Sequence, residues 1–149
     1  MATSIIKNGI LVTEHHAQFG DILLADGRIA ATGDLRHEPA DRVFDAAGCY
    51  VLPGGIDPHV HFALGQGALA SADDFENGTR AALAGGTTSV IDFVTPERGE
   101  RLADALAARR READGRVCGD YGLHMSIVDW RESIPEEMAE AARLGTPSF

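Results

Sequence analysis

Short apolar runs alternate with tight-turn residues over the first 52 positions of the chain. The turn signals are Asn8-Gly9, Asp26-Gly27 and Ala46-Ala47-Gly48, and β-branched or aliphatic residues flank each of them. The pattern predicts short strands at residues 4–7, 10–13, 21–25, 28–32, 43–45 and 49–52. The first two turns are typical of hairpins. We therefore expect a small all-β module, and a purely structural role is its simplest interpretation.

The periodicity changes at Pro53-Gly54-Gly55. From that point apolar runs alternate with segments of helical period, which is typical of βα units and a parallel sheet. The predicted strands span 55–62, 88–94 and 121–128, and the predicted helices span about 73–84, 98–114 and 133–144. A Gly- and Ala-rich loop occupies residues 63–72, and a fourth strand would begin at Ser148-Phe149.

Helix-terminal signals support the predicted helices. Asp73 is the expected N-cap of the first helix, with Glu76 at its capping-box position, and Ser133 with Glu136 forms a second capping box. The basic run Arg109-Arg110-Arg111 falls near the end of the second helix, where cations complement the macrodipole. We interpret this run as a solvated helix end rather than an anion site.

Composition excludes several classes of partner. The formal net charge is −10, so we expect no nucleic-acid partner and no membrane partner, since both would call for basic patches. The start of the chain lacks a signal-peptide pattern, and no run approaches the roughly 20 apolar residues that cross a bilayer. The two cysteines, Cys49 and Cys118, form no metal-binding pattern. A reducing cytoplasm is therefore the expected location.

The length of the chain limits its architecture. An eight-stranded βα barrel needs about 250 residues, whereas these 149 residues provide three βα units and the start of a fourth. We therefore expect a piece of a longer polypeptide. The alternative is a complete α/β binding module, which the open sheet and the short final strand disfavour.

The candidate chemistry lies in Asp57-Pro58-His59-Val60-His61, at the end of the first predicted parallel strand. Because side chains alternate along a strand, His59 and His61 are expected on one face together with Asp57. That end of a barrel strand carries active sites, and two imidazoles are suited to grip one metal ion. A pair hydrogen-bonded to carbonyl groups is the alternative. A catalytic zinc ion needs about three protein ligands, so further ligands must come from elsewhere.

Other polar residues of the predicted sheet offer fewer possibilities. His124, in the third strand, is expected to satisfy a core hydrogen bond rather than to reach the rim. Asp92, in the second strand, could orient a ligand or cap neighbouring backbone amides. Asp57 is expected to support its strand or a metal ligand. The sequence contains no nucleophile elbow and no Walker loop.

Several motifs together resemble the amidohydrolase superfamily and, within it, the cyclic-amide branch of dihydropyrimidinases and D-hydantoinases. They cover essentially the whole chain, at residues 51–62, 73–79, 81–88, 91–94, 120–124 and 145–149. The resemblance implies an α/β fold: the first βα units of a TIM-type (β/α)8 barrel, preceded by part of a small β-sandwich domain. The expected domains are 1–52, in the sandwich, and 53–149, which ends at the start of the fourth barrel strand.

The resemblance also implies a site with two divalent metal ions, usually zinc. His59 and His61 would bind the more buried ion, and a carboxylated lysine that bridges both ions is expected immediately after Phe149. The other ligands and the catalytic residues are expected beyond Phe149, so none of the catalytic residues is expected within this chain. Leu64 and Gln66, in the Gly-rich loop after the histidines, are expected to shape the substrate pocket.

The activity that the resemblance implies is hydrolysis of a cyclic amide or imide ring, of the dihydropyrimidine or hydantoin type, by a metal-activated hydroxide. The expected partner is therefore a small cyclic amide, and the resemblance suggests a homotetramer. The alternative is a non-catalytic relative that keeps the fold as a scaffold or assembly protein. The retained pair His59 and His61 argues against that alternative.

Overall fold

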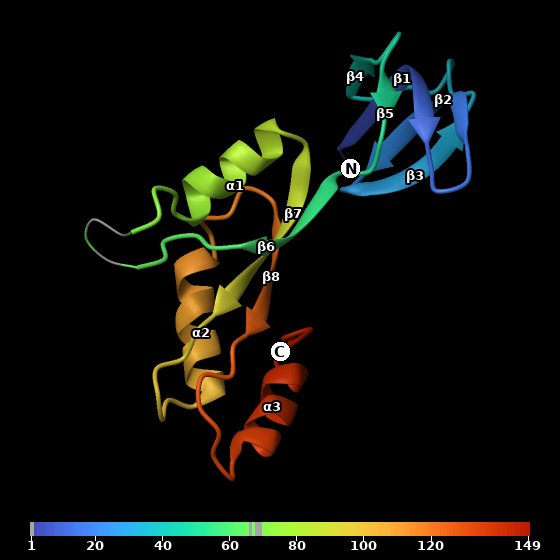
Figure 1. The fold of residues 1–149 in the computed structure, drawn as a ribbon. Coiled ribbons are helices and arrows are strands. Elements are labelled where there is room, and N and C mark those ends of the chain that lie inside the picture. The colour runs from blue at the N-terminus through green and yellow to red at the C-terminus, as the bar shows by residue number, and fades with distance from the viewer. Residues whose placement is uncertain (1, 66, 68–69) are drawn as a thin grey trace. The chain divides into compact units, whose positions relative to one another are not determined.

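The computed structural model describes residues 2–65, 67 and 70–149. It divides into two compact units, Met1–Pro53 and Gly54–Phe149 (Figure 1). The first unit is all β, and the second alternates strands with helices, so the expected α/β architecture is confirmed. Among the described residues, no helix has both the length and the apolar character needed to cross a membrane.

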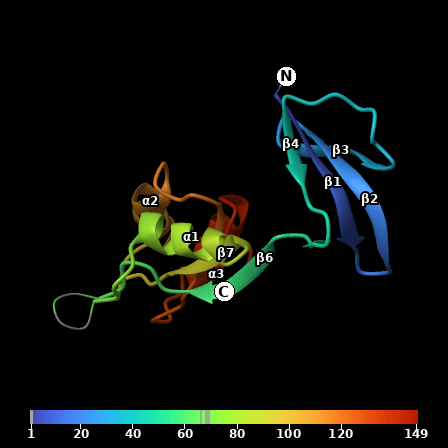
Figure 2. The same ribbon diagram turned by 90° about the horizontal axis from the view of Figure 1, so that it is seen from above.

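One five-stranded sheet makes up the first unit, and Figure 2 shows β1, β2 and β3 side by side. Its strands are β1 (Thr3–Val12), β2 (Ala17–Ala25), β3 (Arg28–Gly33), β4 (Arg42–Asp45) and β5 (Tyr50–Val51). β2 pairs antiparallel with both β1 and β3, whereas β4 and β5 run parallel to β1. Ile5 and Leu11 of β1 are buried and form the apolar centre of this unit.

The predicted hairpin at Asn8-Gly9 is wrong. β1 runs through these residues as one strand, with an irregularity in its pairing to β2 between Ile6 and Gly9. Asn8 has a left-handed φ of 63°, but its amide donates to the Asp21 carboxylate at 2.9 Å. The residues therefore form a bulge instead of a turn, and the chain reverses at residues 13–16.

The hairpin predicted at Asp26-Gly27 is confirmed. The two residues have positive φ angles of 50° and 75°, as the two-residue turns that match the twist of antiparallel strands require. Ala25 and Arg28 form the pair that closes the turn. Here the local signal and the sheet pairing agree, unlike at the bulge of β1.

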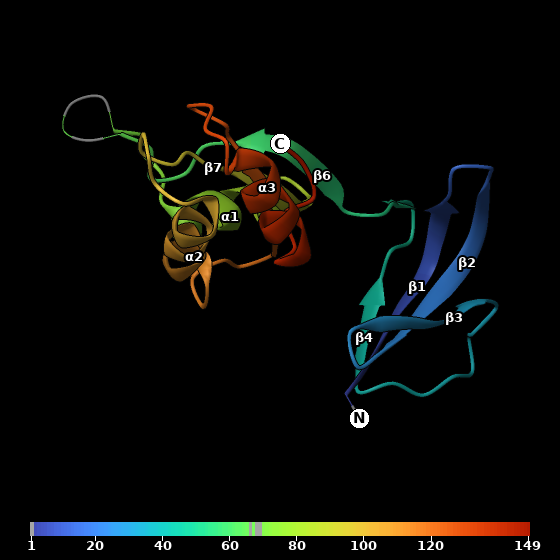
Figure 3. The ribbon, with the colours of Figure 1, turned by 90° about the horizontal axis from the view of Figure 1, so that it is seen from below.

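The second unit is built on a three-stranded parallel sheet, in the order β6-β7-β8. Its elements are β6 (Gly55–Val60), α1 (Phe75–Ala84), β7 (Thr87–Val94), α2 (Leu102–Ala113), β8 (Asp120–Met125) and α3 (Ile134–Arg143). Figure 3 shows the three helices gathered on one side of β6 and β7. The third strand is shorter than predicted, and residues 148–149 are not assigned to a strand, although the Met125 amide donates to the Ser148 carbonyl.

Alternate residues of β7 determine which face of the sheet is buried. Val90, Asp92 and Val94 are each at most 3% exposed, and the two valines belong to apolar clusters that include residues of the helices. Because side chains alternate along a strand, Phe93 lies on the opposite face. The sheet therefore has a helix-covered face and a second face that carries Phe93.

Two of the predicted helix caps differ from the structure. Asp74, not Asp73, is the N-cap of α1, and its side chain accepts from the Asn77 amide at 2.8 Å. Ser133 precedes α3 but makes no side-chain cap, because its hydroxyl donates to the Glu137 carboxylate at 2.8 Å. The predicted capping box at the start of α3 is therefore wrong.

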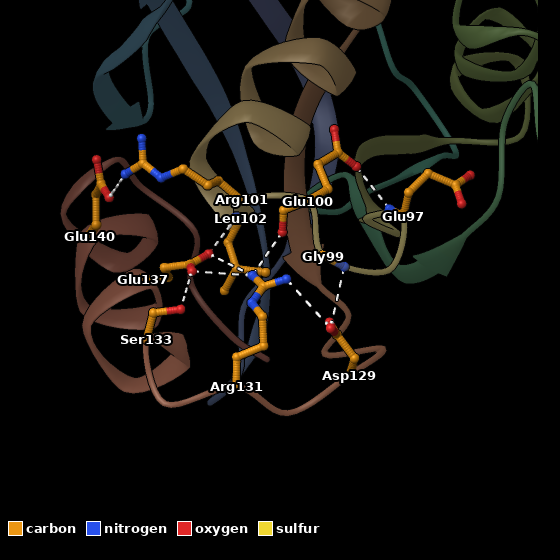
Figure 4. Close-up of polar contacts among 10 residues, drawn as sticks. All are labelled: Glu97, Gly99, Glu100, Arg101, Leu102, Asp129, Arg131, Ser133, Glu137 and Glu140. Carbon is orange, nitrogen blue, oxygen red and sulfur yellow. Dashed lines mark hydrogen bonds and ion pairs between the residues drawn. The ribbon is translucent and has the colours of Figure 1, made fainter.

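Glu137 instead caps a different helix. Its carboxylate accepts from the Leu102 amide, the first residue of α2, at 2.9 Å. Arg131 Nη2 pairs with the same carboxylate at 3.1 Å and donates to the Glu100 carbonyl at 2.9 Å (Figure 4). Asp129 also accepts a hydrogen bond from the Gly99 amide. The network therefore joins the segment that follows β7 to the segment that follows β8.

These contacts make a pH-dependent contribution to stability. The Leu102 amide and then the Ser133 hydroxyl and Arg131 hold the pKa of the Glu137 carboxyl below its ordinary value. A depressed folded-state pKa gives stability above the unfolded value of about 4.3, and that stability is lost as the pH falls further. We expect Glu137→Gln to lower the denaturant midpoint of the whole protein at pH 7 and to weaken its fall between about pH 5 and pH 3.

Glu140→Gln is the matched control for this prediction. Glu140 lies on the same helix and pairs with Arg101 at 2.9 Å, but its side chain is 37% exposed. Its replacement should shift the midpoint little and leave the pH dependence unchanged. Equal pH profiles for wild type and Glu137→Gln would contradict the assignment.

Candidate metal centre

The pairing of β6 with β7 is irregular at the end of β6, where the two histidines lie. The register shifts between Asp57 and Val60, and Asp57 Oδ1 accepts from the His59 amide at 3.1 Å. This bond agrees with the interpretation of Asp57 as a residue that supports the strand. His59 lies within the irregular stretch and His61 directly follows it, and both are exposed.

The two imidazoles converge on one point. Their Nε2 atoms lie 3.2 Å apart, and the rings meet edge to face, at 87° with centroids 5.0 Å apart. Two zinc–nitrogen bonds of about 2.0–2.1 Å at a tetrahedral angle place their nitrogens about 3.3–3.4 Å apart. The 3.2 Å separation is therefore close to that of two imidazole ligands on one such ion. Within residues 2–65, 67 and 70–149, no group of three or more His, Cys, Asp or Glu side chains could hold an ion.

The ring of Phe93, in β7, packs against the rings of both histidines. Its centroid lies 4.5 Å from that of His59, 5.0 Å from that of His61 and 4.9 Å from that of His124. An apolar ring beside a metal ligand restricts the rotation of the imidazole and offers no competing ligand atom. Sequence reasoning did not assign Phe93 a role, although its place beside Asp92 on an alternating strand was visible.

His124 of β8 is held by hydrogen bonds on both ring nitrogens. Its Nε2 lies 3.0 Å from the Pro58 carbonyl, which can only accept, so this nitrogen carries a proton. Its Nδ1 contacts the Ser148 hydroxyl. His124 therefore makes hydrogen bonds as expected, but it is only half-buried and lies against Phe93 beside the histidine pair, so its expected place in the core is wrong.

The position of Arg109 differs from the interpretation of the basic run Arg109-Arg110-Arg111 on α2 as a solvated helix end. The Arg109 side chain is only 12% exposed, and Nη2 pairs at 2.6 Å with Asp92, which is fully buried. A solvated helix end is therefore wrong for this residue. The missed signal is its spacing: Leu102, Leu106 and Arg109 share one helical face, which faces a strand carrying a buried carboxylate.

The loop after the histidines is closed at its base. Leu64 is 48% exposed; its amide donates to Ser71 Oγ and its carbonyl accepts from the Ser71 amide, both at 2.8 Å. Gln66, the other residue expected to shape the pocket, lies outside the described residues. The substrate-pocket role of both residues stays a prediction.

Comparison with known proteins decides the family. The model of the amidohydrolase family matches residues 50–144, which is more than half of the chain. The chain belongs to the amidohydrolase family. This match confirms the family resemblance that the sequence motifs indicated, and the matched residues include His59 and His61.

Proteins similar to this amidohydrolase chain are named D-hydantoinase or dihydropyrimidinase. It is 43% identical to a D-hydantoinase of Geobacillus stearothermophilus over 136 residues, which cover 91% of the chain and 29% of that protein. It is 42% identical to a dihydropyrimidinase of Rattus norvegicus over 151 aligned positions, which cover 97% of the chain and 29% of that protein. The chain thus spans less than a third of the length of these relatives.

Solved structures agree with the fold. A D-hydantoinase structure matches 100% of this amidohydrolase chain with a TM-score of 0.90 at 41% identity, over 32% of its own length. A dihydropyrimidinase from Brevibacillus agri NCHU1002 matches 94% of the chain with a TM-score of 0.88 at 38% identity, over 30% of its own length. These matches confirm the predicted fold class, in which a β module precedes the first βα units of the amidohydrolase barrel.

Proposed function

We propose that the whole protein is a metal-dependent hydrolase that opens a cyclic amide or imide ring of the dihydropyrimidine or hydantoin type. The observation that carries the proposal is the 3.2 Å separation of His59 Nε2 and His61 Nε2 at the carboxyl end of β6, in a chain of the amidohydrolase family. The names of the relatives give the substrate class, and none of those quoted supports the scaffold alternative.

Within this chain, His59 and His61 would hold a divalent ion, and we propose zinc, whose bonds to two imidazole nitrogens suit this spacing. Such an ion, when bound, acts as a Lewis acid toward water and toward an amide carbonyl. The chain's own contribution is to orient the two rings: Asp57 holds the His59 amide, and Phe93 packs against both imidazoles.

The rest of the proposed centre lies beyond Phe149. It comprises a second metal ion, a carboxylated lysine directly after Phe149 that bridges the two ions, and the residues that transfer protons. We also propose a cytoplasmic homotetramer. The family resemblance supports these features. A catalytic zinc ion needs about three protein ligands, and His59 and His61 would supply only two of them.

The domain boundary is part of the same proposal. Residues 1–52 would belong to a β-sandwich and residues 53–149 to the barrel. The division of the chain into the compact units Met1–Pro53 and Gly54–Phe149 supports this arrangement, as does the change from antiparallel to parallel pairing between the main strands of the two units.

Metal content and hydrolysis, measured together on the whole protein, test the proposal. His59→Ala and His61→Ala should each lower the affinity for zinc by more than the roughly 10- to 100-fold that loss of an outer residue costs. Hydrolysis of dihydrouracil and hydantoin should fall in parallel. His15→Ala is the matched control, since His15 is an exposed histidine of the first unit, and it should retain both properties. Unchanged metal content in the variants of the pair would remove these histidines from the site.

A further inference from the structure

Phe62 directly follows His61 and is held at both of its peptide groups. Its amide donates to Asp92 Oδ2 at 3.4 Å, and its carbonyl accepts from Arg109 Nη2 at 2.5 Å. The same Arg109 nitrogen pairs with Asp92 Oδ2 at 2.6 Å, so one ion pair grips the backbone on both sides of Phe62. This grip fixes the direction in which the chain leaves His61.

The ring of Phe62 is fixed as firmly as its backbone. It packs against the ring of Phe75 with centroids 5.6 Å apart, and it lies where a Cβ on Gly78 would approach to 2.1 Å. Phe62 is 8% exposed. Backbone and side chain therefore leave this residue a single position beside the helices.

Arg109 itself has little freedom to move. Its guanidinium carbon lies 4.6 Å from the centroid of the Phe75 ring, and its Nη1 pairs with Glu112 at 2.5 Å. Asp92 is fully buried, so water cannot replace the guanidinium as its partner. The Arg109 Nη2 atom donates to both the Phe62 carbonyl and Asp92, and charge-assisted hydrogen bonds of this kind are stronger than neutral ones.

Asp92 reaches the histidine pair by a second route. Its Oδ1 accepts from the Phe93 amide at 2.6 Å, and the Phe93 ring packs against His59 and His61 on the other face of the sheet. The carboxylate therefore contacts the backbone of both residues that border the imidazoles: Phe62 next in the chain, and Phe93 across the strands.

We propose that Asp92 and Arg109 are positioning residues of the metal centre. They hold Phe62 and Phe93 so that the His61 imidazole stays directed at the point where it meets the His59 imidazole. This inference rests on the proposed function, because it assumes that the histidine pair binds a metal ion. It assigns a functional task to an ion pair whose hydrogen bonds do not involve the side chains of His59 and His61.

A second ion pair distinguishes positioning from general stability. Arg131 and Glu137 are also partly shielded, with side chains 24% and 10% exposed, and they also anchor segments that follow the strands. Within the described part of the chain their hydrogen bonds involve neither Phe62 nor Phe93. If the Asp92–Arg109 pair had a purely structural role, its loss and the loss of the Arg131–Glu137 pair would change zinc affinity equally.

The experiment compares Arg109→Met, Arg109→Lys and Arg131→Met in the whole protein. Zinc affinity is measured by competition with a chromophoric chelator, and thermal unfolding of the metal-free protein is measured beside it. We expect Arg109→Met to weaken zinc binding by about 10- to 100-fold, and Arg131→Met to change it by less than about 3-fold at a comparable loss of thermal stability. Arg109→Lys should lie between, because an ammonium group keeps the charge beside Asp92 but lacks the second nitrogen, Nη1, that pairs with Glu112 and helps to hold the side chain in place.

The outcomes separate the inference from the proposed function. Equal zinc affinities for Arg109→Met and Arg131→Met would overturn the positioning role while leaving the metal site intact. A wild-type protein that binds no zinc would overturn the proposed function and the inference together. If Arg109→Met does not fold, Arg109→Lys decides, since wild-type zinc affinity in that variant contradicts the need for the guanidinium.

Discussion

Asp92→Ala is expected to lower the free energy of unfolding of the whole protein by about 3–5 kcal/mol. The carboxylate is fully buried, and its removal leaves the Arg109 guanidinium, 12% exposed, without its closest partner. It also removes the carboxylate oxygen that accepts from the Phe93 amide at 2.6 Å. Denaturant-induced unfolding of wild type and variant at neutral pH measures the difference.

The double variant Asp92→Ala/Arg109→Met is the control for this prediction. Removing both charges avoids a stranded guanidinium, so the double variant should lose less stability than Asp92→Ala alone. Additive losses would show that the two side chains do not depend on each other. A loss below about 1 kcal/mol in Asp92→Ala would contradict the account of its burial.

Gly78→Ala is expected to destabilise the protein by about 1–2 kcal/mol, although alanine is the better helix former by about 1 kcal/mol. Gly78 lies inside α1, and a Cβ there would come within 2.1 Å of Phe62 Cε1 and 2.5 Å of Phe62 Cδ1. The added methyl group must therefore displace a ring that is itself held by Phe75. Thermal or denaturant unfolding of the whole protein shows the sign.

Two further variants separate packing from helix propensity. Asn77→Ala changes the neighbouring, exposed position of the same helix, and it should be neutral or slightly stabilising because only propensity changes. In the background of Phe62→Leu, which removes the obstructing ring, Gly78→Ala should cost less than it does alone. A stabilised Gly78→Ala protein would contradict the close approach of Phe62.

Periodicity was a sound guide to the fold because it reports which side of each element is buried. The apolar run at residues 88–94 predicted β7, and the segment of helical period at residues 98–114 predicted α2, which buries Leu102 and Leu106. The histidine pair was equally readable, since a period of two places His59 and His61 together. Such predictions need only neighbours in the sequence.

The failures arise where a distant partner competes with a local signal. At Asn8-Gly9 the turn signal was overridden by the Asp21 carboxylate, which accepts from the Asn8 amide. Arg109 was assigned to solvent as a helix-end cation, yet its partners lie 17 and 47 residues away along the chain, at Asp92 and Phe62. Local composition carries no record of such contacts.

The separation between Phe62 and Arg109 also sets an order of events during synthesis. Arg109 is made 47 residues after Phe62, a delay of roughly 2–9 s at elongation rates of about 5–20 residues per second. During that interval the nascent chain contains both histidines but not the guanidinium that fixes the backbone beside them. The proposed ligand pair is thus synthesised before the side chain that we propose positions it.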